Sequence, residues 1–258
     1  MFSAIKLLIA RRFPSLLQGS NRKFDSYAAS RQEIKAFSNA AEREIEKLFY
    51  FHSGRCIHKW AHYLEVYERE FALLRGATIR FLEIGVSEGG SLELWRRYFG
   101  EKAIITGIDI NPACRSRVDP PNKVRIGSQT DAGFLADVVE EMGGPLDVIL
   151  DDGSHVASHI LITFNLLFPR LRTGGLYVIE DMHTSYWAEI FGGGYRRKGT
   201  AVELGKTLVD DMHGWYHDNG QEQLDKTEIA SVRFYDSILV IEKGNVAEPR
   251  HIKVGSDE

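Results

Sequence analysis

From residue 79 onward, short runs of apolar and β-branched residues alternate with segments of helical periodicity. Five runs have the length of a strand: 79–85, 103–110, 122–127, 146–151 and 175–181. Continuous apolar runs of this length, with helices between them, are typical of a parallel sheet that is buried on both faces. We therefore predict an α/β, Rossmann-like fold. Its helices are expected at 91–100, 131–143 and 156–171, and Gly174 and Gly175 are expected to form a turn that feeds the fifth strand.

The two ends of the chain differ in sequence pattern from this alternation of strands and helices. Residues 1–78 are polar and helical in pattern, with no strand signal, and predict an N-terminal helical region. A further helix at 202–217 and a hairpin around Tyr235 and Asp236 extend the central domain. We expect a mostly parallel seven-stranded sheet with helices on both faces. Three segments follow from this prediction: the helical region 1–78, the catalytic domain 79–245 and a C-terminal tail 246–258.

Composition and charge exclude several classes of protein. The formal net charge is −4, which offers no excess of positive charge to nucleic acid. Cys56 and Cys114 show neither CxxC spacing nor a metal pattern, so a reduced, cytoplasmic compartment is expected. No apolar run approaches the roughly 20 residues that span a bilayer, and the first 17 residues lack the order of a signal peptide. We expect those 17 residues to form a helix that packs on the protein itself.

The first predicted strand ends in EIGVSEGGS, residues 83–91, at the edge where open α/β sheets bind ligands. A dinucleotide fingerprint needs a glycine two positions after Gly85, but that position is Ser87. The acidic Glu83 does not favour a pyrophosphate either. An acidic, glycine-containing loop suits a positively charged ligand better, and S-adenosylmethionine carries such charge on its sulfonium and amino groups.

The next two strands also end in polar residues. Asp109 can accept hydrogen bonds from both hydroxyls of a ribose, and Ser128, Gln129 and Asp131 can bond an adenine edge. Two purely structural alternatives stay open: Asp109 belongs to a turn, and Asp131 is a helix N-cap. Taken together and in order, these strand ends favour a class I methyltransferase. Lys59, His62 and Tyr63 are further candidates for contact with the cofactor or the substrate, although core packing explains Tyr63 better.

Two acidic pairs, Asp151–Asp152 and Glu180–Asp181, lie where the fourth and fifth runs end. Like charges on neighbouring strands repel, and their burial is costly unless something neutralises them. A hard divalent cation does so, with Mg²⁺ first and Mn²⁺ or Ca²⁺ next. The alternative is that the aspartates cap the next helix and Glu180 pairs with an arginine. Asp151 is expected to face the cofactor or to support the loop.

VRIGSQTD, DVILDDGSH, FPRLRTGGLYVIEDMHTSYW and LVDDMH resemble the metal-dependent sugar O-methyltransferases of macrolide biosynthesis. Mycinamicin and demethylmacrocin O-methyltransferases are the type members, and the cephalosporin-hydroxylase-like family is related. The similarity covers about residues 58–217. It implies that Asp152, Glu180 and Asp181 bind a magnesium ion and that His155 is the general base. His159 and His183 are alternative bases.

The resulting hypothesis is a Mg²⁺-dependent transfer of a methyl group from S-adenosylmethionine to a sugar hydroxyl of a glycoside or saccharide. Its partners would be a small-molecule substrate and further copies of the chain, in a homo-oligomer. Tyr186 and Trp187 can stack on sugar rings, and the glycines at 192–194 can form a lid. Three alternatives remain: methylation of a catechol or another vicinal diol, a hydroxylase-like oxidoreductase, and a non-catalytic binding protein.

Overall fold

The computed structural model describes residues 28–217 and 227–255, and the chain divides into two compact units, 1–52 and 53–258. In the first unit, helix α3 (Arg31–Ala40) begins with a capping box in which Ser30 and Glu33 bond each other's backbone. Helix α4 (Glu44–Tyr50) follows. The helix expected within the first 17 residues lies outside the described residues.

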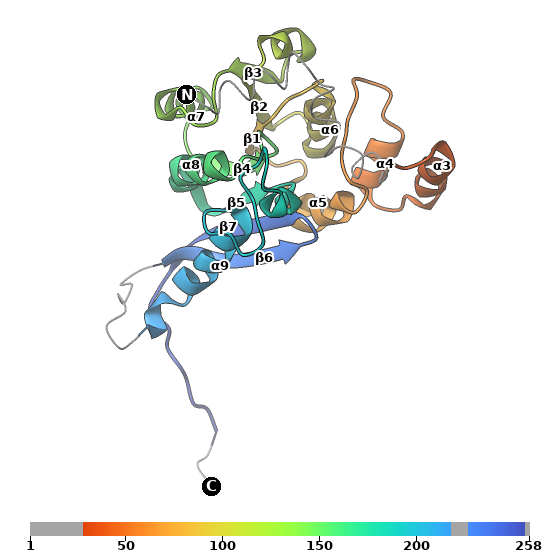
Figure 1. The fold of residues 1–258 in the computed structure, drawn as a ribbon. Coiled ribbons are helices and arrows are strands. Elements are labelled where there is room, and N and C mark those ends of the chain that lie inside the picture. The colour runs from red at the N-terminus through yellow and green to blue at the C-terminus, as the bar shows by residue number, and fades with distance from the viewer. Residues whose placement is uncertain (1–27, 218–226, 256–258) are drawn as a thin grey trace. The chain divides into compact units, whose positions relative to one another are not determined.

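The second unit is built on one seven-stranded sheet in the order β3-β2-β1-β4-β5-β7-β6 (Figure 1). Strands β1 to β5 are parallel, β7 is antiparallel to β5, and β6 pairs with β7 as a hairpin. This confirms the predicted sheet of five parallel strands and a terminal hairpin. The strands are β1 (Arg80–Ile84), β2 (Ile104–Asp109), β3 (Lys123–Ile126), β4 (Leu146–Asp151), β5 (Leu171–Ile179), β6 (Thr227–Tyr235) and β7 (Ile238–Val246).

Helices cover both faces of this sheet, as the alternation of apolar runs predicted. The α-helices are α5 (Tyr63–Phe71), α6 (Gly90–Phe99), α7 (Ala132–Glu141), α8 (Ala157–Leu167) and α9 (Ala201–Met212). Short 3-10 helices join them at η2 (Ala72–Leu74), η3 (Pro112–Arg117), η4 (Phe168–Arg170), η5 (Met182–Tyr186) and η6 (Gly214–Tyr216).

Successive side chains of β1 show how the two faces are packed. Phe81 contacts the rings of Phe71 on α5 and Trp95 on α6, at centroid distances of 6.3 and 5.2 Å. Leu82 and Ile84 are also fully buried, but they join the apolar cluster formed with α7, α8 and α9. Because adjacent residues of a strand point to opposite faces, one strand serves both layers of the core. Among the described residues, no helix combines the length and apolar character needed to cross a bilayer.

The glycine pair before the fifth run departs from the prediction. Gly174 and Gly175 were expected in a turn that feeds the strand, but β5 already begins at Leu171. The pairing with β4 changes register between Leu146 and Val148, and Gly174 adopts φ +76°. The glycines therefore form an irregularity inside the strand, where a left-handed residue is tolerated without a Cβ.

The register of the parallel strands determines what lies at the ligand-binding edge. Asp151 is paired with Ile84 on one side and with Ile179 on the other. Asp152 then donates its backbone N–H to the carbonyl of Ile84 (3.0 Å), and Glu180 donates to that of Asp151 (3.0 Å). Both acidic pairs consequently leave the sheet at the same level, side by side.

Candidate active site

Three side chains converge where β4 and β5 end. The Nε2 atom of His155 lies 3.7 Å from Asp152 Oδ1 and 3.5 Å from Asp181 Oδ2. One ligand atom from each of these residues falls within 4.8 Å of the others, and all three side chains are partly exposed. Two carboxylates and an imidazole in this arrangement fit a divalent cation such as Mg²⁺ or Mn²⁺. We call Asp152, His155 and Asp181 the donor set.

Two residues of the donor set have an uncommon backbone conformation. His155 and Asp181 both adopt φ +55°, in the left-handed region that non-glycine residues rarely occupy. Asp181 directly precedes η5, so the left-handed residue lies where the chain turns from the end of β5 into this helix. Such outliers cluster at functional sites because the surrounding structure holds them in place.

Glu180, predicted to be a magnesium ligand, lies beside the donor set but points inward. It is 1% exposed, and Tyr67 donates its hydroxyl to Oε1 at 2.5 Å, while Lys59 donates to Oε2 at 2.8 Å. Burial raises the pKa of Glu180 to about 8, against the opposing pull of Lys59. Its partner is thus a lysine, where the alternative prediction named an arginine.

Lys59 connects the acidic residues from the side of the protein interior. Its Nζ lies 2.6 Å from Asp152 Oδ2, 2.8 Å from Glu180 Oε2 and 4.0 Å from Glu83 Oε1, and its side chain is 3% exposed. Burial works to lower the pKa of Lys59, but the three carboxylates outweigh it and raise the pKa above its usual range. The lysine is therefore a permanently charged ammonium within a group of acids.

Tyr63 is also buried, and its hydroxyl donates to Asp181 Oδ1 at 2.7 Å and accepts from the Asp181 backbone N–H at 3.2 Å. Contact with the cofactor was predicted for Tyr63, and the structure places its hydroxyl on an acidic residue of the donor set. Tyr67 lies one helical turn further along α5, whereas Lys59 precedes the helix. The four-residue spacing from Tyr63 was the available signal for Tyr67, a site residue that sequence reasoning missed.

The loop after β1 is organised by Asp109. Its Oδ2 accepts from the backbone N–H groups of Val86 (3.0 Å) and Ser87 (3.1 Å), and Oδ1 accepts from Asn111 (2.7 Å). Gly85 adopts φ +93°, and a Cβ there would come within 2.0 Å of the Asp152 carbonyl oxygen. A glycine is thus required for the β1 loop to approach the β4 loop. Gly85, Ser87 and Asp109 lie together at this edge, and their contact with a cofactor stays a prediction.

Glu83 precedes this loop but has no exposed surface. Its carboxylate accepts from the Ser91 hydroxyl at 2.7 Å and from the Trp95 indole N–H at 3.2 Å. Burial raises the pKa of Glu83 to about 7, although Lys59 lowers it in part. Its contacts are therefore with the protein interior.

The remaining predicted cofactor residues lie after β3 and β4. Gln129 links these ends, because its Oε1 accepts from the Ser154 N–H at 2.8 Å and its Nε2 donates to Thr163 at 3.0 Å. Asp131 caps α7 by accepting from the Phe134 N–H at 3.1 Å, as the structural alternative of a helix N-cap predicted, and it is exposed. The Ser128 hydroxyl lies 2.9 Å from that of Thr130.

Asp151 carries its carboxylate into the interior. It is 2% exposed and accepts from the Tyr177 hydroxyl at 3.2 Å and from Gln129 Nε2 at 3.4 Å. Burial raises the pKa of Asp151 to about 6. These bonds correspond to support of the loop, the second of the two roles expected for this residue.

The two alternative bases are each tied to a serine. His159 Nδ1 lies 2.8 Å from Ser154 Oγ, and His183 Nδ1 lies 2.6 Å from Ser237 Oγ. Burial lowers the pKa of both imidazoles. His155, in contrast, belongs to the donor set with Asp152 and Asp181.

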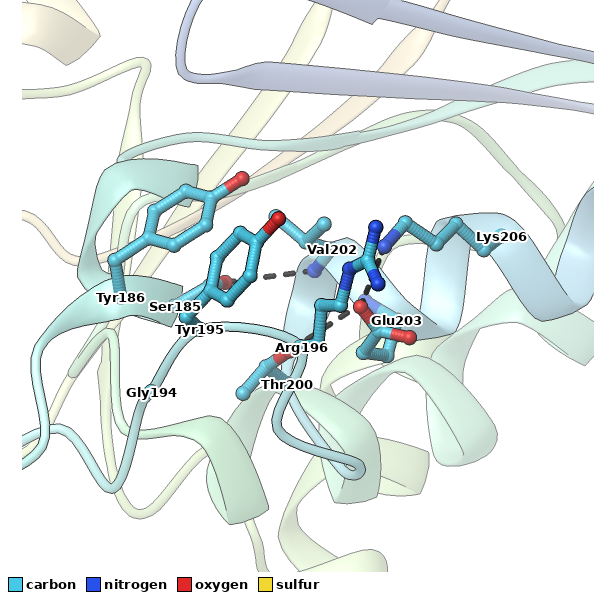
Figure 2. A pocket seen from close by; sticks show the side chains of 9 residues that line it. All are labelled: Ser185, Tyr186, Gly194, Tyr195, Arg196, Thr200, Val202, Glu203 and Lys206. Carbon is cyan, nitrogen blue, oxygen red and sulfur yellow. Dashed lines mark hydrogen bonds and ion pairs between the residues drawn. The ribbon is translucent and has the colours of Figure 1, made fainter.

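The loop that follows η5 borders a pocket shown in Figure 2. Gly193 and Gly194 donate their N–H groups to the carbonyls of Trp187 and Ser185, each at 2.8 Å, so the glycines let the loop pack closely on η5. Arg196 lies over the Tyr195 ring, 5.3 Å from its centre. The pocket is lined by Ser185, Tyr186, Gly194, Tyr195, Arg196, Thr200, Val202, Glu203 and Lys206.

The sheet order and the ligand-binding edge define the class I methyltransferase fold. Residues 82–182 match the family described as a methyltransferase domain. The chain is 36% identical over 191 residues to the 8-demethyl-8-alpha-L-rhamnosyl tetracenomycin-C 2'-O-methyltransferase of Streptomyces olivaceus, covering 70% of this chain and 50% of that protein. It is 37% identical over 198 residues to the mycinamicin VI 2''-O-methyltransferase of Micromonospora griseorubida, covering 69% and 47%.

A solved structure agrees with these relatives. The MycE methyltransferase of the mycinamycin biosynthetic pathway, in complex with Mg and SAH, superimposes with a TM-score of 0.68 at 31% identity, over 80% of this chain and 55% of that one. These findings confirm the resemblance that the motifs indicated: the chain is a homologue of sugar O-methyltransferases. It spans about half the length of the curated relatives that it matches.

Proposed function

We propose that this protein transfers a methyl group from S-adenosylmethionine to a sugar hydroxyl of a glycoside or saccharide, with Mg²⁺ held by Asp152 and Asp181 of the donor set and His155 left free to act as the base. The observation that carries the proposal is the convergence of Asp152, His155 and Asp181 at the carboxyl ends of adjacent parallel strands. The relatives are named as methyltransferases that act on sugar-bearing compounds, and the MycE complex holds Mg and SAH.

The chemistry requires a hydroxyl oxygen that has become nucleophilic. When bound, Mg²⁺ supplies a Lewis acid that orients an acceptor hydroxyl and lowers its pKa. S-adenosylmethionine supplies the methyl carbon, and its bond to sulfur breaks with the electron pair leaving on the sulfur. Asp152 and Asp181 fix the direction from which the acceptor approaches, and much of the rate would come from this positioning.

His155 is proposed to take the proton of the acceptor hydroxyl at Nε2. The imidazolium that forms would lie beside Asp181 and Asp152, whose oxygens are 3.5 and 3.7 Å away. Phe191 covers the ring from the following loop at a centroid distance of 6.4 Å.

The rest of the acceptor is proposed to extend to the pocket in Figure 2. Ser185 and Tyr186 line this pocket and lie on η5, which directly follows Asp181. Tyr195 is 78% exposed, and an exposed phenol ring offers an apolar face and a polar tip to a sugar. An acceptor that contains a second sugar or an aglycone has a surface to contact there.

Transfer of labelled methyl groups to a panel of glycosides, free saccharides and catechols tests the proposal. We expect glycosides or saccharides to be methylated, EDTA to abolish transfer, and added Mg²⁺ to restore it. Methylation of catechols alone would favour the vicinal-diol alternative, and transfer that survives complete chelation would disprove the role of the metal.

A variant separates the two roles that the position of His155 allows. If His155 is the base, His155→Gln abolishes methyl transfer while Mn²⁺ and S-adenosylmethionine still bind with nearly unchanged affinity. A large loss of Mn²⁺ affinity would instead identify the imidazole as a metal ligand. The homo-oligomer stays a prediction, which light scattering of the full chain checks.

A further inference from the structure

The buried ammonium of Lys59 has no role in the chemistry described so far. It bonds Asp152 Oδ2 and Glu180 Oε2 at 2.6 and 2.8 Å, whereas His155 lies near the other oxygen of Asp152. A lysine whose side chain is 3% exposed is rare unless its charge is paired. Here one ammonium is shared by two carboxylates, with Glu83 a third at 4.0 Å.

The contacts divide the carboxylate oxygens into two groups. Asp152 gives Oδ2 to Lys59 and keeps Oδ1 toward His155. Asp181 gives Oδ1 to Tyr63 and keeps Oδ2 toward His155. Both oxygens of Glu180 are engaged, by Tyr67 and Lys59. Each aspartate therefore presents one oxygen to the centre of the donor set, and Glu180 presents none.

We infer that Lys59 is a positioning residue that acts as the internal counter-ion of the metal site: it retains Glu180 and sets the affinity of the donor set for a divalent cation. This inference rests on the metal-binding part of the proposed function. A fixed positive charge in a buried site repels a divalent cation more strongly than it would in water. Lys59 thus weakens cation binding while it prevents the acidic residues from repelling one another.

The counter-ion role predicts an unusual direction for the change in metal affinity of the variant Lys59→Met. A residue that merely preorganises metal ligands weakens metal binding when it is removed. A counter-ion does the opposite, because its loss frees Glu180 and removes a repelling charge. We expect Lys59→Met to bind Mn²⁺ at least tenfold more tightly than the native chain, measured by calorimetry or electron paramagnetic resonance on the full chain.

Lys243→Met is the matched control. Lys243 is also buried, at 8% exposure, but its ammonium bonds the carbonyl oxygens of Pro169 (2.9 Å) and Phe168 (3.4 Å). Its loss removes a buried lysine without touching the donor set. We expect the Mn²⁺ affinity of Lys243→Met to stay within threefold of the native value.

A second pair of variants tests the inference if Lys59→Met does not fold. Glu180→Gln leaves Lys59 with less negative charge around it, and it should bind Mn²⁺ more weakly than the native chain. Removing Lys59 as well, in the double variant Lys59→Met/Glu180→Gln, should raise the affinity at least tenfold above that of Glu180→Gln. Restored affinity after deletion of two opposite charges is the signature of charge compensation.

Two results overturn the inference: Mn²⁺ affinity in Lys59→Met that is equal to or below the native value, or equal affinities of Glu180→Gln and the double variant. Both titrations omit S-adenosylmethionine and acceptor. A chain that binds Mn²⁺ as expected and methylates no glycoside therefore refutes the proposed function and leaves the role of Lys59 intact.

Discussion

Replacing Glu83 by glutamine tests how the charge of this buried carboxylate makes the free energy of unfolding depend on pH. Glu83 is fully buried, and burial raises its pKa from 4.5 to about 7. The unfolded chain loses this proton first, so the folded state loses stability as pH rises from 4.5 through 7. At roughly 1.4 kcal/mol per pKa unit, the loss reaches roughly 3 kcal/mol above pH 7.

Glutamine stays neutral over this range and can keep both hydrogen bonds. Its amide oxygen can accept from Trp95, and its amide nitrogen can donate to the Ser91 hydroxyl. Relative to the native chain, the free energy of unfolding of Glu83→Gln should therefore rise by about 2–3 kcal/mol between pH ~5 and ~8.5. Urea unfolding followed by tryptophan fluorescence at both pH values measures this difference.

Glu228→Gln serves as the control for this experiment, because Glu228 is exposed on β6. Its unfolding free energy should follow that of the native chain at both pH values. Parallel curves for Glu83→Gln, within about 0.5 kcal/mol of the native chain, would refute the reasoning about the buried carboxylate.

Further variants probe the donor set, the loops and the pocket. Tyr63→Phe removes the donor 2.7 Å from Asp181 Oδ1, and we expect a loss of about 1–3 kcal/mol in thermal unfolding together with weaker Mn²⁺ binding; unchanged values in both assays would contradict this. Gly85→Ala adds a Cβ that would lie 2.0 Å from a backbone oxygen, and it should be destabilised more than the control Gly100→Ala. At Gly100, φ is +86° but nothing lies within 4 Å of the added Cβ, so a loss of about 1–2 kcal/mol is expected there. Equal urea midpoints for the two variants would contradict this prediction. Tyr195→Ala should raise KM for a glycoside several-fold at constant kcat, and an unchanged KM would remove the pocket from the acceptor site.

Much of the fold could be predicted because local patterns encode it. Buried parallel strands appear as apolar runs, and the residue that ends each run lies at the edge where ligands bind. For that reason the sequence could place Asp109, Asp152 and Asp181 at the strand ends, while their roles stay predictions. Gly174 misled the prediction, because a glycine inside an irregular strand resembles one in a turn.

The partners of these residues could not be predicted in the same way. Lys59 meets Asp152 and Glu180 across 93 and 121 residues of sequence, and no local periodicity reports such a contact. Glu180 and Asp181 both follow the last residue of β5, so the alternation of side chains along a strand does not assign their directions. The left-handed turn at Asp181 then places that residue in the donor set, and the composition of the sequence gives no sign of it.

The central claim is that the ends of β4 and β5 hold a divalent cation, and anomalous diffraction from crystals grown with Mn²⁺ tests it most directly. We predict one strong peak about 2.0–2.3 Å from Asp152 Oδ1 and Asp181 Oδ2, with Lys59 still bonded to Glu180. The absence of a peak between these two aspartates at saturating Mn²⁺, or a peak elsewhere on the chain alone, would contradict the account.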